Sequence, residues 1–180
     1  MDGVTIEPLN PDLMRELAPD LVELDGVIYR KLFDGYADRA WTADDFCRNA
    51  PHRHELSCVA RHPGEDGSPT VVGFWVASRR NLTTVQVERL AVQPALQNKG
   101  IGKALFASAR ELAGAAGARQ MMLYVNAVNR TAIAFCEVLG FSQLTGERLE
   151  TLVGDQPNTT IQNNFVFIDD VHHHAMLATL

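Results

Sequence analysis

The sequence is poor in the features that mark disulfide-bonded, zinc-binding or membrane proteins. Its 180 residues contain three widely spaced cysteines and no C-x-x-C pair, which predicts neither a disulfide framework nor a zinc knuckle. No apolar run approaches the length that spans a bilayer, and the opening MDGVTIEPLN lacks the apolar core of a secretory signal. We therefore expect a cytoplasmic protein without a membrane partner.

Positive charge is also scarce. The 16 lysines and arginines are outnumbered by 22 aspartates and glutamates, which gives a formal net charge of −6. Because nucleic-acid binding needs a concentrated basic face, no nucleic-acid partner is expected. The acidic balance favours a cationic partner.

What the sequence does have is an ordered series of strand and helix patterns. Its length and its hydrophobic content of 46% predict one domain over residues 1–180. Polarity patterns predict strands at 4–9, 55–61, 70–79, 83–92, 120–125 and 172–180, and helices at 13–28, after Thr42, at 105–113 and at 132–139. Pro19 is expected to break or kink the first helix, and residues 146–171 to form a long excursion before the terminal strand. This order predicts an α/β or α+β fold with a mixed sheet.

Two glycines, Gly100 and Gly102, open a helix directly after a strand. A Walker loop is excluded because Gln97 replaces its first glycine and Ala104 its metal-binding hydroxyl, and a dinucleotide fingerprint is excluded because Leu105 replaces its third glycine. The unpaired N–H groups at the start of such a helix suit a pyrophosphate. A tight turn that allows close packing is the alternative.

Two longer blocks give the glycines a context. The run RLAVQPALQNKGIGKALF, followed by LYVNAVNRTAIAFCEVLGF, resembles the signature blocks of the GCN5-related N-acetyltransferase (GNAT) superfamily, most strongly over Val87–Phe141. The resemblance implies a central, mostly antiparallel sheet that is splayed between strands 4 and 5 and flanked by helices. It also implies direct acetyl transfer in a ternary complex, from acetyl-CoA as co-substrate and without a metal, to a small-molecule amine or a protein amino group.

The resemblance also implies which residues hold the coenzyme. A bulge near the end of the fourth strand would leave main-chain groups free for the pantetheine arm, and the start of the next helix would surround the pyrophosphate. Asn129 would bond the pantetheine or anchor the helix that follows it. The implied cofactor-binding residues are Leu90, Ala91, Val92, Gln97, Asn98, Lys99, Gly100, Ile101, Gly102, Lys103, Asn129, Ala132 and Phe135.

Glu88 is the candidate general base, because an alkyl amine with a pKa near ~10 must lose a proton before it attacks a thioester. Glu88 matches a catalytic glutamate in many relatives, and its side-chain parity on the strand matches that of Leu90. The alternative is that Glu88 pairs with Arg89 or with a neighbouring strand. The main-chain N–H of Val92 is the candidate donor to the developing oxyanion.

Cys136 is the main departure from the family pattern, because it stands where the family usually places the tyrosine that protonates the departing thiolate. Three interpretations are open: a thiol acid, a buried residue that only packs, and a nucleophile that forms an acyl-enzyme. The missing tyrosine also raises a second function, that of an acyl-CoA-binding sensor or interaction module without turnover.

Four further features concern the acceptor and assembly. The resemblance implies that the acceptor enters between the first helix pair and the loop that joins the last strands. In this sequence those regions carry aspartates that could attract a cationic amine: Asp34, Asp38, Asp44, Asp45, Asp155, Asp169 and Asp170. Tyr124 stands where the ribosomal-protein alanine acetyltransferases carry a strand-five glutamate, so their specificity is not transferred to this chain. On a strand, two of His172, His173 and His174 share one face and the third points away, which argues against three metal ligands. Two interpretations are open: a catalytic or substrate-gating histidine, and ordinary cross-strand packing. The segment 146–171 also suggests a homodimer, in which it completes a neighbouring subunit.

Overall fold

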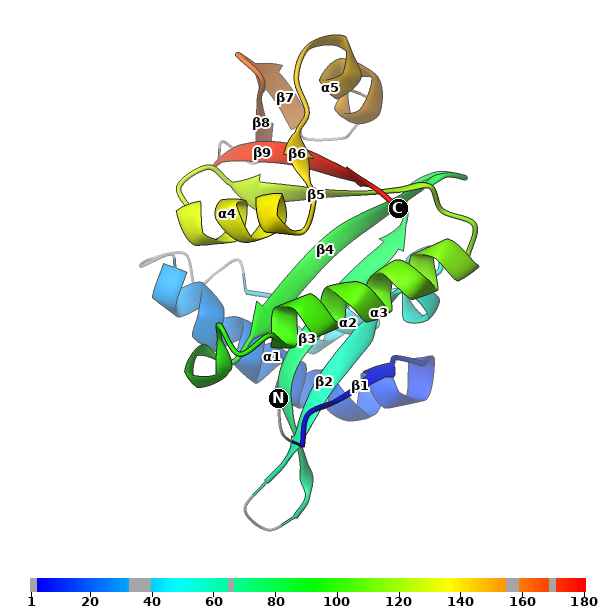
Figure 1. The fold of residues 1–180 in the computed structure, drawn as a ribbon, viewed down its shortest axis with the longest axis vertical. Coiled ribbons are helices and arrows are strands. Elements are labelled where there is room, and N and C mark those ends of the chain that lie inside the picture. Colours follow the sequence, from blue (N-terminus) through cyan, green and yellow to red (C-terminus); the bar gives the residue numbers. More distant parts are fainter. Residues whose placement is uncertain (1–2, 33–39, 65–66, 155–158, 169–170) are drawn as a thin grey trace. The chain divides into compact units, whose positions relative to one another are not determined.

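The computed structural model describes residues 3–32, 40–64, 67–154, 159–168 and 171–180. The chain divides into two compact units, a first unit of residues 1–118 and a second unit of residues 119–180 (Figure 1). Each unit has its own strands, helices and core. The single domain over 1–180 stays a prediction.

The first unit contains an antiparallel sheet in the order β1-β2-β3-β4. Its strands are β1 (Thr5–Pro8), β2 (Cys58–Pro63), β3 (Pro69–Arg79) and β4 (Thr84–Val92). The predicted strands at 4–9, 70–79 and 83–92 are confirmed. The strand predicted at 55–61 is wrong at its start, because His54–Leu56 forms a short 3₁₀ helix, η2, in which the Leu56 N–H donates to the carbonyl of Arg53 at 3.3 Å.

Helices cover both faces of this sheet. They are α1 (Pro11–Leu32), α2 (Ala43–Cys47) and α3 (Ile101–Ala115), with the short 3₁₀ helix η3 (Pro94–Leu96) before α3. The prediction that Pro19 breaks α1 early is wrong, since α1 runs unbroken from Pro11 to Leu32 with Pro19 exposed. The kink at Pro19 stays a prediction. Pro19 lacks a main-chain N–H, but it lies on the solvent side of α1. The apolar face of the helix, which buries Leu17, Leu21 and Leu24, is therefore intact.

The two faces of the sheet pack differently. On one face, α1 and α2 enclose a core with Phe46 and Phe74, whose rings meet edge to face at a centroid distance of 5.3 Å. On the other face lies α3, which Figure 1 shows crossing the strands, with Phe106 against Trp75. Gly73 permits this close approach, because a Cβ there would lie 3.2 Å from Leu105 Cδ1 and 3.0 Å from a main-chain oxygen of β4.

The second unit is built on β5 and β9, which pair antiparallel from Gln120 opposite Thr179 to Asn126 opposite His173. On its other edge β9 pairs with β6 and β8, and β8 pairs with β7. The elements are β5 (Gln120–Asn126), α4 (Arg130–Val138), β6 (Ser142–Gln143), α5 (Gly146–Val153), β7 (Thr159–Gln162), β8 (Phe165–Ile168) and β9 (Val171–Thr179). The strand predicted at 120–125, the helix at 132–139 and the terminal strand are confirmed.

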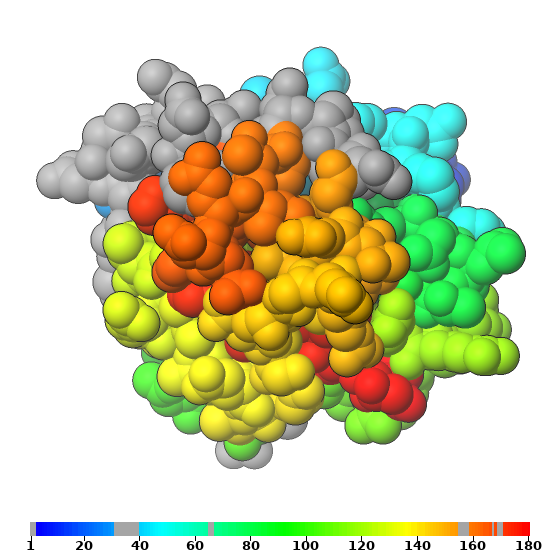
Figure 2. Space-filling model, turned by 90° about the horizontal axis from the view of Figure 1, so that it is seen from above, coloured from blue at the N-terminus to red at the C-terminus, as the bar shows by residue number. Residues whose placement is uncertain are grey.

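Residues 146–171 contain more structure than the predicted excursion. Helix α5 buries Leu149 and Val153 against Val166 of β8, and β7 and β8 form a hairpin. Atoms of this segment, coloured gold to orange, lie on the face that Figure 2 shows. Asn163 and Asn164 connect the hairpin with φ of 50° and 65°, the left-handed conformations that a two-residue type I′ turn requires. The Asn-Asn pair was therefore the sequence signal for this hairpin.

The predicted fold class, a mixed α/β structure with mostly antiparallel strands flanked by helices, is confirmed. The splay between the fourth and fifth strands stays a prediction, because β4 belongs to the first unit and β5 to the second. Among the helices of the described ranges, none is long and apolar enough to cross a bilayer.

Candidate active site

A bulge in β4 determines where Glu88 points. Val76 of β3 lies opposite Arg89 and the next residue, Ala77, lies opposite Val87, so Glu88 is the extra residue of the bulged strand. Because a bulge places two successive side chains against one partner, Glu88 and Arg89 both face α1 and α2. The expected irregularity of this strand is thus present, and it lies at Glu88.

The bulge overturns the predicted side-chain parity. Leu90 lies opposite Trp75, whose ring packs against α3, so Leu90 is on the α3 face of the sheet. Glu88 is on the opposite face, where it contacts Ser78 and Arg53. The expectation that Glu88 and Leu90 share a face is wrong, because one inserted residue reverses the alternation of the strand.

Glu88 lies in a network of polar side chains and is only 10% exposed. Its Oε2 accepts from Nη2 of the fully buried Arg53 and, at 3.3 Å, from Nη2 of Arg48. Its Oε1 accepts from the hydroxyl of Ser78 on β3. The alternative interpretation, that Glu88 pairs with a neighbouring strand, is confirmed by its contact with Ser78 of β3. Its ion pairs are with Arg48 and Arg53.

Arg89 forms a separate stack on the same face of the sheet. Its guanidinium lies 4.7 Å from the centroid of the Tyr29 ring and 4.9 Å from that of Trp41. Its Nε lies 3.8 Å from Oδ1 of the buried Asp25, and Oδ2 of Asp25 accepts the main-chain N–H of Trp41 at 3.1 Å. Burial raises the pKa of Asp25, while Arg89 and the Trp41 N–H act in the opposite direction.

The end of β4 presents main-chain groups on the side away from β3. The N–H of Gln93 donates to the carbonyl of Val72 at 2.8 Å, so residue 93 bonds toward β3. Because consecutive residues of an antiparallel strand bond to opposite sides, the main-chain groups of Leu90 and Val92 point the other way. Gln97 Nε2 donates to the Val92 carbonyl at 3.0 Å, so that oxygen is already engaged.

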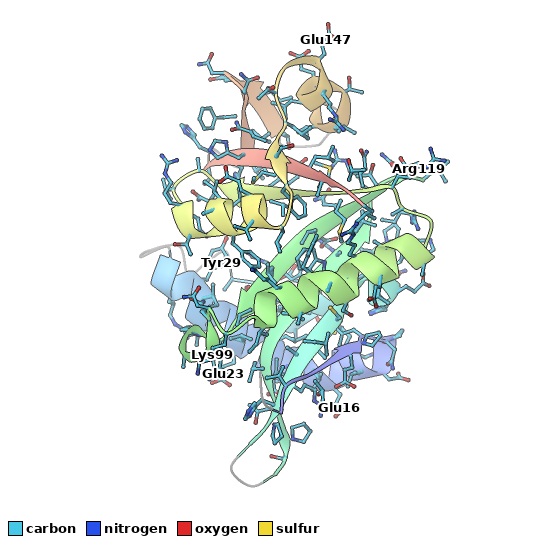
Figure 3. The ribbon with its side chains drawn as sticks, viewed as in Figure 1. Glu16, Glu23, Tyr29, Lys99, Arg119 and Glu147 are labelled. Atoms are coloured by element: carbon cyan, nitrogen blue, oxygen red, sulfur yellow. The ribbon has the colours of Figure 1, made fainter. Side chains whose placement is uncertain are left out.

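The turn before α3 exposes the start of the helix. Asn98 and Gly100 have φ of 62° and 87°, and Gly100, as the N-cap, supplies no side-chain cap. Lys99 lies on the surface of this turn (Figure 3) and Lys103 is exposed in the first turn of α3, which contains no acidic residue. Helix starts favour acids and caps, so this pattern suits a helix start that receives an anion.

Of the predicted residues in the second unit, Asn129 is a helix cap. Its Oδ1 accepts the N–H of Ala132 at 3.1 Å, which confirms the interpretation that Asn129 anchors the following helix. Ala132 and Phe135 are half-buried on α4. Sequence reasoning placed these three residues around the pantetheine arm, and that role stays a prediction.

Cys136 is buried in α4, with an exposed fraction of 5%. Burial, assisted by the neighbouring Glu137, raises the pKa of its thiol to about 11. A thiol with this pKa is protonated at neutral pH, which disfavours the nucleophile. It is also a weaker acid than an ordinary thiol with a pKa near ~8.5, so proton transfer to a departing thiolate is uphill.

The terminal histidines lie on β9 as the strand alternation predicts. His172 and His174 both pack on Phe165, with ring centroids 5.9 Å and 5.0 Å away, and the His173 ring interacts with the carbonyl of Val171 at 2.8 Å. Within the described ranges, no three histidine, cysteine, aspartate or glutamate side chains are grouped so as to hold a metal. Burial and Arg130 both lower the pKa of His174, which keeps it neutral near pH 7.

Of the aspartates expected to attract the acceptor, Asp44 and Asp45 lie in the first turn of α2, where Asp45 completes a capping box with Thr42. This contact gives Asp45 a structural role. The others lie outside the described residues: Asp34, Asp38, Asp155, Asp169 and Asp170.

Comparison with known proteins assigns the chain to a family. The acetyltransferase (GNAT) family model matches residues 18–141, more than half of the chain, and the chain therefore belongs to this family. A mycothiol acetyltransferase of Streptomyces avermitilis is 31% identical over an alignment of 134 residues, and the match covers 66% of this chain and 44% of that protein. The chain spans less than half the length of the curated relatives that it matches.

Solved structures agree on the fold. The PaiA N-acetyltransferase of Thermoplasma acidophilum, crystallised in complex with coenzyme A, superposes with a TM-score of 0.68 at 17% identity, covering 98% of this chain and 99% of that one. The ribosomal-protein-S18-alanine N-acetyltransferase of Escherichia coli gives a TM-score of 0.65 at 21% identity, covering 98% and 93%. At these identities the likeness concerns the fold.

Proposed function

We propose that the chain is an N-acetyltransferase that moves an acetyl group from acetyl-CoA to a primary amine. The observation that carries the proposal is the end of β4. There, main-chain groups of Leu90 and Val92 point away from β3, and the chain then turns into a helix start without a side-chain cap. Membership of the acetyltransferase family supports the same activity.

In this proposal the first unit binds the coenzyme mainly through its backbone. The main chain of Leu90–Val92 pairs with the pantetheine arm as an added strand would. The N–H groups of Ile101, Gly102 and Lys103 at the start of α3 receive the pyrophosphate, with the charges of Lys99 and Lys103 nearby. Gln97 was expected to bind the coenzyme directly. In this proposal its side-chain amide instead stabilises the turn by donating to the Val92 carbonyl.

The reaction forms a C–N bond between the amine and the acetyl carbon and breaks the C–S bond of the thioester. Glu88, directly or through water, takes the proton that the amine loses, and the departing thiolate takes up one proton. The N–H of Val92 faces away from β3 and serves as the donor to the developing oxyanion. Since burial raises the pKa of Cys136 to about 11, we assign that residue to packing, with water as the proton source for the thiolate.

The acceptor is a small-molecule amine or a protein amino group. The family relatives include a mycothiol acetyltransferase and, among structures of the same fold, a ribosomal-protein-S18-alanine N-acetyltransferase, so both classes belong in a substrate screen. We further propose a cytoplasmic location, in keeping with the free thiols of Cys47, Cys58 and Cys136. A homodimer stays a prediction, which light scattering of the intact chain tests.

The second candidate function is an acyl-CoA-binding sensor without turnover, which the buried Cys136 in place of the family tyrosine favours. One experiment separates the two. The protein is incubated with acetyl-CoA and a panel of amines and peptides, and free thiol and acetylated product are measured by mass spectrometry. Product formation supports the transferase. Tight binding of acetyl-CoA with no product from any amine, and no product after Cys136→Tyr, supports the sensor.

A further inference from the structure

Arg53 is the one charged side chain in the described part of the first unit with no solvent exposure. It lies just before η2, and its Nη1 donates to the main-chain carbonyls of Asp45 and Phe46 of α2. Its Nη2 donates to Oε2 of Glu88, and its guanidinium lies 5.3 Å from the Trp41 ring centroid. Burial lowers the pKa of Arg53, and Glu88 opposes that shift.

The contacts of Arg53 exceed what docking α2 requires. Nη1 alone bonds to the main-chain carbonyls of α2. Nη2 instead donates to the carboxylate of Glu88, which lies 35 residues away in sequence. Burying such a pair is costly, and apolar side chains often stabilise a core as well as an ion pair does. The pair therefore points to a requirement for a fixed carboxylate at Glu88.

The hydrogen bonds also distinguish the two oxygens of Glu88. A carboxylate oxygen has two acceptor sites. Oε2 receives both Arg53 and Arg48, so its sites are filled, whereas Oε1 receives the hydroxyl of Ser78 alone among the contacts of the described residues. One acceptor site thus remains, and it is on Oε1.

We infer that Arg53 is a positioning residue for acetyl transfer, which with Ser78 holds the Glu88 carboxylate so that Oε1 is the oxygen that takes the proton of the amine. The inference rests on the proposed function. Arginine suits this position better than lysine, because its planar fork bonds two carbonyls and a carboxylate in fixed directions, and an ammonium group offers one compact charge.

The test compares Arg53→Met, Arg53→Lys and Ser78→Ala with the wild-type chain, and measures kcat and KM for the amine, Kd for acetyl-CoA and the melting temperature. Arg53→Met is expected to lower kcat about 100-fold, the lower end of what general-base catalysis contributes, with Kd for acetyl-CoA unchanged. Arg53→Lys is expected to recover about 10-fold of that loss, since it restores the charge without the fork. Ser78→Ala removes only the Oε1 contact and is expected to lower kcat with little change in melting temperature.

The matched control is Arg79→Met. Arg79 is a half-buried arginine of β3 that donates to the carbonyls of Leu82 and Ala116 and has no contact with Glu88. It is expected to lower the melting temperature while kcat stays within about 2-fold of wild type.

Two outcomes would overturn parts of this account separately. If the wild-type chain transfers acetyl groups and both Arg53→Lys and Ser78→Ala match its kcat, Arg53 is structural and the inference is wrong. If the wild-type chain acetylates no amine, the proposed function fails and the inference falls with it. Should Arg53→Met fail to fold, Arg53→Lys and Ser78→Ala decide the question alone.

Discussion

The side-chain amide of Gln97 donates to the carbonyl oxygen of Val92 at 3.0 Å, which ties the turn before α3 to the last residue of β4. This contact joins the two segments that the proposal assigns to the coenzyme, the strand end and the helix start. It also means that the Val92 carbonyl is engaged within the protein, so its N–H is the group that Val92 offers to a ligand.

We predict that Gln97→Ala weakens the binding of acetyl-CoA several-fold, because the turn loses its link to β4. The lost hydrogen bond costs about 0.5–1.5 kcal/mol of unfolding free energy. Calorimetric titration and urea denaturation measure the two effects. The exposed Gln93→Ala, in the same connection, is the control, and equal affinities for the two variants would contradict the role of Gln97.

Glu88→Gln is predicted to lower kcat about 100-fold or more while Kd for acetyl-CoA stays within about 2-fold, because the amide accepts no proton at neutral pH. Steady-state kinetics with the best amine of the panel and calorimetry give the two numbers. Glu111→Gln, an exposed change on α3, should leave both unchanged. Full activity of Glu88→Gln would remove Glu88 from the mechanism.

The Cys136 thiol is predicted to react slowly with Ellman's reagent at pH 8 in the folded chain and fast in denaturant, because its pKa of about 11 leaves little thiolate. The half-buried Cys47 is the internal comparison. Mass spectrometry of the labelled peptides assigns each rate. Fast labelling of Cys136 in the folded chain would contradict the raised pKa and would support a nucleophilic role for Cys136.

The same pKa shift has a consequence for stability against pH. The folded chain keeps the Cys136 proton up to about pH 11 while the unfolded chain loses it near 9.0. Between these values the folded state binds more protons, so the free energy of unfolding falls as pH rises. Urea denaturation at pH 8 and pH 10 should show a smaller decrease for Cys136→Ala than for wild type, and equal decreases would contradict the shift.

Asn129→Ala is predicted to lower the free energy of unfolding by about 1 kcal/mol, because the start of α4 loses its side-chain cap. Asn129→Asp keeps an acceptor for the Ala132 N–H and should retain most of the stability. If Asn129→Asp matches wild type in stability but binds acetyl-CoA more weakly, the amide also contacts the coenzyme. Equal affinities would restrict Asn129 to the cap.

Much of the fold was predictable from the sequence, because local patterns of residues determine its helices and strands. The spacing of Leu17, Leu21 and Leu24 predicted the buried face of α1, and the two signature blocks predicted the family and the helix start at Gly100. The segment 146–171 was harder to predict, since α5 has only 8 residues and the signal for the hairpin turn is the single pair Asn163-Asn164.

The surroundings of Glu88 were not predictable in the same way. The orientation of the Glu88 side chain depends on a bulge, and no residue type in the sequence indicates that bulge. Its partners Arg53 and Ser78 are distant in sequence and belong to no motif. From the sequence alone, a buried arginine cannot be distinguished from an exposed one, because its burial depends on tertiary contacts. The sequence thus predicted which main-chain segments form the candidate site, whereas the side-chain contacts of Glu88 were found only in the structure.

The most direct test of the account is calorimetric titration of acetyl-CoA into the wild-type chain and into Gly102→Glu. Gly102 lies in the first turn of α3 and outside the set of glycines with positive φ, so its backbone conformation suits a residue with a side chain, and an acid near a helix start is favourable. The account predicts that the variant keeps its melting temperature and loses acetyl-CoA binding, because the carboxylate repels the pyrophosphate. Unchanged affinity in a folded Gly102→Glu variant would show that the coenzyme is not held at this helix start.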